Sequence, residues 1–226
     1  MMRERFSKEV SNLKQLLQEM SALTECAILK AVKSMPPDNT HDADEILRGD
    51  AFIDAMEVRI EEECLKLIAL YQPVASDLRK IITILKVNVE IERAADFAVS
   101  IANRALDMQR YTQGNLEIFD FGEMAKKAEK MFKDALDAFV YGDVLRAYDV
   151  LGADDAVDDI HRGNYDKVKS MILRYPDEAG YYLDCLTVSR ALERIADIAT
   201  NICEDVIYLE QGKIIRHQTK PKQLHD

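Results

Sequence analysis

Carboxylate side chains recur one helical turn apart along this sequence of 226 residues. The first half carries Asp50, Asp54, Glu57, Glu61, Glu92 and Asp96, and the second half carries Asp154, Asp158, Glu193, Asp197 and Glu204. Because an α-helix turns through about 100° per residue, residues three or four apart share one face and form narrow acidic lines. Like charges at this spacing destabilise a helix by about 0.2–0.5 kcal/mol per pair. A hard multivalent cation bound by these oxygens would relieve the repulsion, so the pattern predicts metal binding.

Three interpretations of the acidic lines stay open. Such pairs are common on solvated helix faces, but their recurrence at corresponding places in both halves favours two metal sites. A metal-free adapter would instead use the lines to contact basic patches on partner proteins. A di-iron enzyme of the ferritin type needs Glu-x-x-His, for which Asp158-x-x-His161 is the nearest match. Glu193 and Asp197 lie opposite the apolar line of their helix, which predicts a partly wet surface site.

Apolar residues at a spacing of three and four predict the helices that must carry these lines. We expect six helices, over residues 6–35, 46–71, 73–113, 124–140, 143–175 and 188–210. Proline at position 73 would occupy the first turn of the third helix, where its missing amide hydrogen costs least. Gly142 breaks the fourth helix and Asp143 can cap the fifth.

The second half repeats the first. Met20 with Met124, Asp50 with Asp154 and other pairs share an offset of 104 residues, while the third and sixth helices align at an offset of 101. Short connections favour antiparallel neighbours. The sequence therefore predicts an all-α fold of two tandem three-helix bundles, residues 1–113 and 114–213, followed by a polar tail, residues 214–226.

Composition narrows the functional classes. A formal net charge of −11 disfavours binding to nucleic acid. The four cysteines are widely spaced, which predicts buried thiols in a reducing compartment. We expect a soluble, cytoplasmic protein, because the sequence shows neither the apolar region of a signal peptide nor a stretch of about 18 apolar residues. Without a glycine-rich phosphate loop or a GxSxG motif, we do not expect an enzyme.

Three motifs carry a family resemblance. They are Tyr71-Gln-Pro-Val-Ala-Ser-Asp-Leu-Arg-Lys-Ile, Glu92-Arg-Ala-Ala-Asp, and Glu193-Arg-Ile-Ala-Asp-Ile-Ala-Thr-Asn-Ile-Cys-Glu204. With these motifs, residues 5–213 resemble the PhoU family of regulators associated with bacterial phosphate transport. The resemblance implies paired three-helix bundles whose acidic motifs hold multinuclear metal sites, with iron as the expected metal and Zn, Mn, Mg or Ca as alternatives. The implied ligands are Asp50, Asp54, Glu57, Glu92, Asp96, Asp154, Asp158, Glu193, Asp197 and Glu204.

The resemblance also implies a role and partners. It implies a negative regulator of the phosphate-starvation response that links the phosphate ABC transporter to a sensor histidine kinase. We expect a homodimer that reaches the membrane only through these partners. Two departures from the family pattern concern the ligands. Ser100 and Asn103 replace an Asn and a Glu, which predicts weaker metal binding in the first half. His161 replaces Glu57 in the second half, either as a ligand or as a surface histidine.

Overall fold

The computed structural model describes residues 2–35, 40–111 and 119–215, and this part of the chain is helical without strands. Six α-helices are present: α1 (Met2–Lys33), α2 (Thr40–Tyr71), α3 (Ala75–Met108), α4 (Gly122–Tyr141), α5 (Val144–Arg174) and α6 (Ala179–Gln211). Two short 3-10 helices, η1 (Gln109–Tyr111) and η2 (Pro176–Glu178), follow α3 and α5. The expected all-α class and six helices are confirmed.

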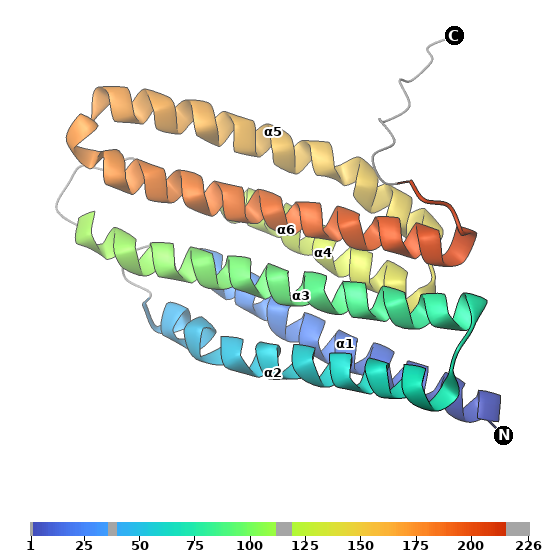
Figure 1. Ribbon diagram of the computed structural model, residues 1–226. Coiled ribbons are helices and arrows are strands. Elements are labelled where there is room, and N and C mark those ends of the chain that lie inside the picture. Colours follow the sequence, from blue (N-terminus) through green and yellow to red (C-terminus); the bar gives the residue numbers. More distant parts are fainter. Residues whose placement is uncertain (1, 36–39, 112–118, 216–226) are drawn as a thin grey trace, which may run out of the picture.

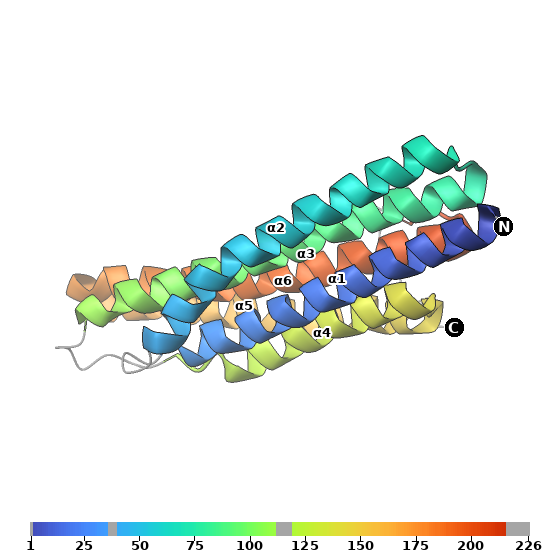
Figure 2. The same ribbon diagram turned by 90° about the horizontal axis from the view of Figure 1, so that it is seen from below.

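The two three-helix units, α1–α3 and α4–α6, lie side by side with their long axes roughly aligned (Figures 1 and 2). Helix α3 packs on α6 and α1 packs on α4, while α2 and α5 each contact the helices of their own unit on the outer sides. Helices α3 and α6 run antiparallel, since Lys86 Nζ lies 3.0 Å from Asp205 Oδ1 and Arg104 Nη1 lies 3.2 Å from Asp184 Oδ1. The third helix of each unit therefore lies at the centre of the molecule.

The apolar seams predicted from the sequence form the core. The buried residues of these seams are, on α1, Phe6, Val10, Leu13, Leu17, Met20 and Ala31, and on α6, Val188, Ile195, Ile198, Ile202 and Val206. Each large apolar side chain removed from water contributes about 1.5–3 kcal/mol to folding, which offsets the weak intrinsic stability of single helices. The residues left on the opposite helix faces are free to carry charge.

Several helix ends differ from the predicted ones. Helix α3 begins at Ala75, not at Pro73, because Gln72 adopts a left-handed conformation (φ 44°) that ends α2 and turns the chain first. Its α-helical part ends at Met108 and η1 follows, so the predicted end at residue 113 was wrong for the α-helix. The predicted boundary between residues 113 and 114 lies outside the described residues, as does the tail beyond residue 215.

The turn between α4 and α5 follows the prediction. Gly142 takes the left-handed conformation (φ 67°), which an L-side chain adopts only with strain. The Asp143 side chain then accepts a hydrogen bond from the Arg146 amide at 3.1 Å, capping α5.

Three of the four cysteines are buried as predicted, and burial raises the pKa of Cys64, Cys185 and Cys203 to about 12. Cys26 is exposed, so the prediction was wrong there. It lines a cavity between α1 and α2. Within the described residues, no helix combines the length and the apolarity needed to cross a bilayer.

Candidate functional site

The acidic lines of α2 and α3 face one another across the surface of the first unit. Burial is the largest cause that raises the pKa of each of four carboxyl groups, and neighbouring carboxylates raise it further. These groups are Asp50 and Glu57 on α2 and Glu92 and Asp96 on α3. The charge of Asp96 raises the pKa of Asp50 across the two helices, and the charges of Glu57, Asp54 and Asp50 raise that of Glu92. We call this set, with Asp54, the first acidic groove.

Asp54 occupies the centre of the first acidic groove. Its charge contributes to the raised pKa of all four other carboxyl groups. The charged neighbours that shift these four pKa values are themselves all carboxylates. In addition, Asp50 Oδ1 is buried and accepts no hydrogen bond. A buried carboxylate oxygen without a donor is costly, so this oxygen is suited to a cation.

The corresponding second acidic groove lies between α5 and α6 and is partly neutralised. Burial is again the main cause that raises the pKa of Glu193, followed by the charge of Asp197. Asp158 and Asp154 on α5 raise it as well, which shows that both acidic lines meet here. Arg194 acts in the opposite direction, with Nη1 2.8 Å from Asp197 Oδ2 and Nε 3.5 Å from Glu193 Oε2.

The second acidic groove is also partly wet, as predicted. The Glu193 side chain is 20% exposed and that of Asp197 is 37% exposed. Glu193 Oε2 is nevertheless buried and accepts no hydrogen bond. Each groove thus contains a buried carboxylate oxygen without a hydrogen bond, but only in the second does an arginine form ion pairs with two of the carboxylates. This contrast favours the first groove for cations, opposite to the expectation drawn from Ser100 and Asn103.

Each groove has a buried polar residue next to it, at equivalent positions of α3 and α6, that contacts the helix on the other side of the groove. Asn88 Nδ2 donates to the Glu57 carbonyl oxygen at 2.8 Å, and Ser189 Oγ lies 2.9 Å from His161 Nδ1. His161 occupies the position of Glu57, so both contacts join the same places in the two units. Sequence reasoning missed Asn88 and Ser189. Their spacing of four residues before Glu92 and Glu193 was the available signal, because it continues each acidic line.

The contact with Ser189 limits how His161 could act as a metal ligand. Burial and then the charge of Arg190 lower the pKa of His161, which favours the neutral imidazole. Since Nδ1 already has Ser189 as a partner, only Nε2 could serve as a metal ligand.

Not every predicted ligand comes together. Glu204 lies eleven residues beyond Glu193 on α6, about 16 Å along the axis. Its charge is not among those that shift the pKa of Glu193. Across the described residues, no three His, Cys, Asp or Glu side chains converge closely enough to hold one metal ion. Both grooves are therefore open acidic surfaces whose carboxylates, repelling one another, would have to rotate inward to bind a cation.

Comparison with known proteins identifies the repeated unit. The family model of the PhoU domain matches twice, at residues 17–105 and 121–206. A phosphate-specific transport system accessory protein PhoU homolog from Clostridium acetobutylicum is 33% identical over 216 residues, covering 94% of this chain and 97% of the relative. The homolog of the same name from Aquifex aeolicus is 35% identical over 217 residues, covering 93% of this chain and 95% of the relative.

Solved structures agree with this similarity. The crystal structure of PhoU from Pseudomonas aeruginosa has a TM-score of 0.87 and 32% sequence identity, covering 92% of this chain and all of that chain. The phosphate transport system regulatory protein PhoU from Streptococcus pneumoniae has a TM-score of 0.82 and 28% identity, with coverage of 92% and 98%. The likeness in fold thus extends over nearly the full length of each structure.

Proposed function

The chain belongs to the PhoU family, and from this premise we propose that it is a metal-binding regulator of phosphate uptake and phosphate-starvation signalling. In this proposal it acts in the cytoplasm as a negative regulator that couples a phosphate ABC transporter to a sensor histidine kinase. The names of its relatives, accessory and regulatory proteins of phosphate transport, support a regulatory rather than an enzymatic role.

The first acidic groove carries the metal-binding part of the proposal. Its donors are carboxylate oxygens, which hard cations prefer, and the buried Asp50 Oδ1 lacks a hydrogen-bond donor. Asp50, Asp54 and Glu57 on α2 would hold a cation together with Glu92 and Asp96 on α3. Asp154, Asp158, Glu193 and Asp197 would form the weaker second site. A bound cation would supply positive charge that offsets the repulsion among these carboxylates, and iron is the metal proposed first.

Because of this repulsion, a bound cation would change how α2 packs on α3. Helix α2 lies on the outer side of the first unit and contacts α1 and α3. Carboxylates on α2 and α3 raise one another's pKa, so their charges oppose close approach of the two helices at neutral pH. Neutralising these charges would favour a closer packing of α2 on α3. A change in the position of α2 would then alter the outer surface that partner proteins contact.

Elemental analysis tests the metal sites. The chain would be purified without chelator or metal-affinity resin, beside a Glu92→Ala, Asp96→Ala variant and a Glu193→Ala, Asp197→Ala variant. We expect bound transition metal in the wild type, a large loss in the first variant and a smaller loss in the second. A Glu62→Ala variant, which removes an exposed carboxylate elsewhere on α2, is the control. Background metal in the wild type would refute the metal sites and leave the metal-free adapter.

A second experiment tests the regulatory role. A strain lacking the chain would carry a reporter gene under a promoter that the histidine kinase controls. We expect the reporter to be active despite ample phosphate, and to be silenced again by the wild-type chain. If the strain without the chain keeps the reporter silent, the negative regulatory role is wrong, whatever the metal content.

A further inference from the structure

Asn88 on α3 is a fully buried polar residue with one side-chain atom that is not hydrogen-bonded. Its relative exposure is 0%. Nδ2 donates to the Glu57 carbonyl oxygen at 2.8 Å, so the side chain points from α3 across to α2. Oδ1 on the same amide accepts no hydrogen bond from any of the described residues. Because a buried amide oxygen without a donor costs free energy, this oxygen is suited to a ligand.

The equivalent position of the second unit is fully hydrogen-bonded. Ser189, at an offset of 101 from Asn88, is also 0% exposed. Its Oγ accepts from Asn164 Nδ2 at 3.0 Å and lies 2.9 Å from His161 Nδ1. At an offset of 104, Asn164 corresponds to Ile60, which has no side-chain donor. The three-helix bundle therefore does not require an unsatisfied oxygen here, and this oxygen is a particular feature of the first unit.

The Asn88 amide lies next to residues of both acidic lines. Asn88 precedes Glu92 by about one helical turn on α3, and it is hydrogen-bonded to the backbone of Glu57 on α2. Amide oxygens bind hard cations together with carboxylates. A neutral oxygen would add a ligand to the first acidic groove without adding to the repulsion among its carboxylates.

The basic residues nearest to Asn88 along α3 form ion pairs elsewhere. Lys86 Nζ lies 3.0 Å from Asp205 Oδ1 on α6, and Arg93 Nη1 lies 3.0 Å from Glu90 Oε2 on α3 itself. Their positive charges are thus directed to other carboxylates. A cation from solution is then the ligand that suits both the amide oxygen and the carboxylates beside it.

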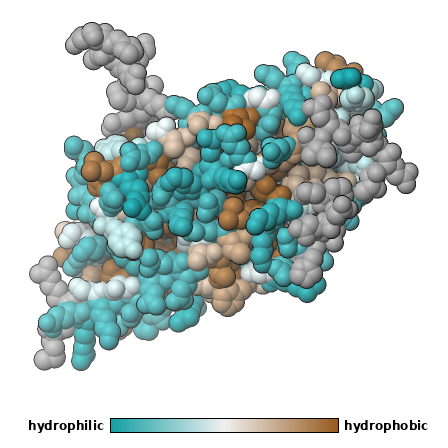
Figure 3. Space-filling model, turned by 180° about the vertical axis from the view of Figure 1, so that it is seen from behind, coloured by the Kyte–Doolittle hydropathy of each residue, from teal (hydrophilic) through white to brown (hydrophobic). Residues whose placement is uncertain are grey.

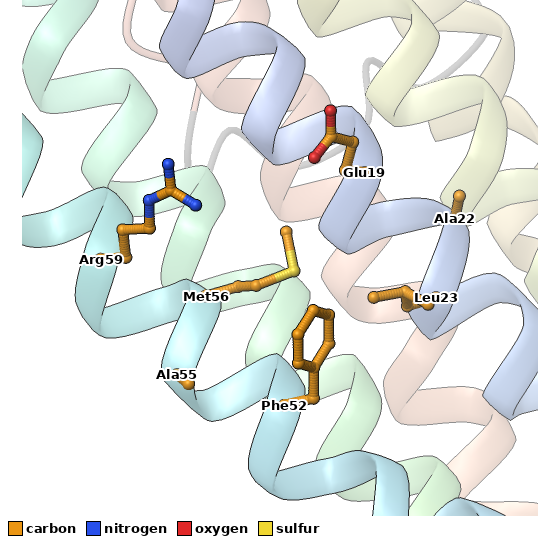
Figure 4. A pocket seen from close by; sticks show the side chains of 7 residues that line it. All are labelled: Glu19, Ala22, Leu23, Phe52, Ala55, Met56 and Arg59. Carbon is orange, nitrogen blue, oxygen red and sulfur yellow. The ribbon is translucent and has the colours of Figure 1, made fainter.

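A cavity between α1 and α2 offers no comparable set of oxygen atoms. This cavity of about 600 Å³ is lined by apolar residues that include Leu23, Phe52 and Met56, and its charged residues, Glu19 and Arg59, have opposite signs (Figure 4). On the face formed by α1 and α4, hydrophobic side chains form separate patches within a mostly hydrophilic surface (Figure 3). The oxygen atoms suited to a cation lie instead between α2 and α3.

We propose that the Asn88 amide oxygen is a ligand of the cation in the first acidic groove, in addition to the carboxylates of α2 and α3. This inference rests on the proposed metal-binding function and names a ligand outside the acidic lines. With Asn88, every donor in this groove is an oxygen, so the site favours hard cations, of which Mn²⁺ serves as the probe.

The test measures Mn²⁺ binding to the first groove alone. The parent chain carries Glu193→Ala and Asp197→Ala, which disable the second groove. Asn88→Leu removes the amide oxygen at similar size, and Asn88→Asp keeps an oxygen but removes the Nδ2 donor. The matched control is Thr83→Val, which replaces another buried polar residue of α3 by an apolar one. Free Mn²⁺ would be counted by electron paramagnetic resonance, and urea unfolding in chelator would report the stability of each metal-free chain.

We expect Asn88→Leu to bind Mn²⁺ at least about tenfold more weakly than the parent, and Asn88→Asp and Thr83→Val to bind at least as tightly as the parent. The urea midpoint of metal-free Asn88→Leu should not fall, because an apolar group replaces an acceptor that had no partner. A structural role would instead lower the midpoint and the affinity together.

Four results would overturn the inference alone, while Mn²⁺ binding by the parent supports the proposed metal site. They are an unchanged affinity in Asn88→Leu, a joint loss of affinity and urea midpoint in that variant, a loss in Asn88→Asp as large as in Asn88→Leu, and an equal loss in the Thr83→Val control. If the parent itself binds no Mn²⁺ and the wild type holds only background metal, the proposed metal site fails and the inference fails with it.

Discussion

Replacing Asp54 with Asn should stabilise the metal-free chain. Asp54 is exposed on α2, so the substitution removes no buried contact, and Asn and Asp have similar helix propensities. Its charge raises the pKa of Asp50, Glu57, Glu92 and Asp96, so four repulsive interactions are lost together. At about 0.2–0.5 kcal/mol for each interaction, reduced for partial exposure to water, the free energy of unfolding should rise by about 1 kcal/mol at low salt and pH 7.5.

The pH dependence of this gain in unfolding free energy follows from the direction of the pKa shifts. These four carboxyl groups have folded pKa values above their unfolded values of 3.8 or 4.5. They bind more protons in the folded state, so their destabilising effect is fully present above the folded pKa values and disappears as the pH falls below the unfolded values. The difference in stability between variant and wild type should therefore shrink toward pH 4. Salt at about 1 M should also shrink it by screening.

Urea unfolding in chelator, followed by far-UV circular dichroism, measures this effect. Glu62→Gln, which neutralises an exposed carboxylate elsewhere on α2, should change the unfolding free energy by less than about 0.5 kcal/mol. In buffer with metal the wild type should become more stable than the variant, because the wild type gains stability from metal binding while Asp54→Asn removes a ligand. A variant that is no more stable than the wild type at low salt, or whose gain is unchanged by salt, would refute the mutual repulsion inferred for the first acidic groove.

Three further substitutions test other parts of the structure. Ser189→Ala should lower the free energy of unfolding by about 1–3 kcal/mol in urea titrations, because it leaves the partly buried His161 without its hydrogen-bond partner, and a neutral result would contradict that role. Gly163→Ala should raise the unfolding free energy by about 0.5–1 kcal/mol, since no atom outside its own helix segment lies within 4 Å of an added Cβ; thermal unfolding at a lower temperature would argue against a regular α5 there. Lys86→Met should cost about 1–3 kcal/mol by leaving the buried Asp205 carboxylate without its lysine, and the loss should disappear in the Lys86→Met, Asp205→Asn double variant.

The sequence by itself determined the helices, the duplication and the position of each acidic line within its helix. These features are local. Apolar residues at a spacing of three and four bury one face of a helix, and Asp50 and Asp54 share a face whatever lies opposite them. The turn at Gly142 and Asp143 was equally predictable, because left-handed backbone and capping side chains are properties of a few adjacent residues.

Only the tertiary structure decided what each face meets. The periodicity of α3 and α6 specifies a buried face but not its partner, and the central α3–α6 contact depends on pairs such as Lys86 with Asp205, more than 100 residues apart. The same reason explains why Cys26 is exposed, whereas the contact of Arg194 with Asp197 is a local i,i+3 pair within α6. Long-range packing likewise created the cavity that Leu23 of α1 and Phe52 of α2 line together, because the distance between these residues is set by how two helices cross and not by either sequence segment.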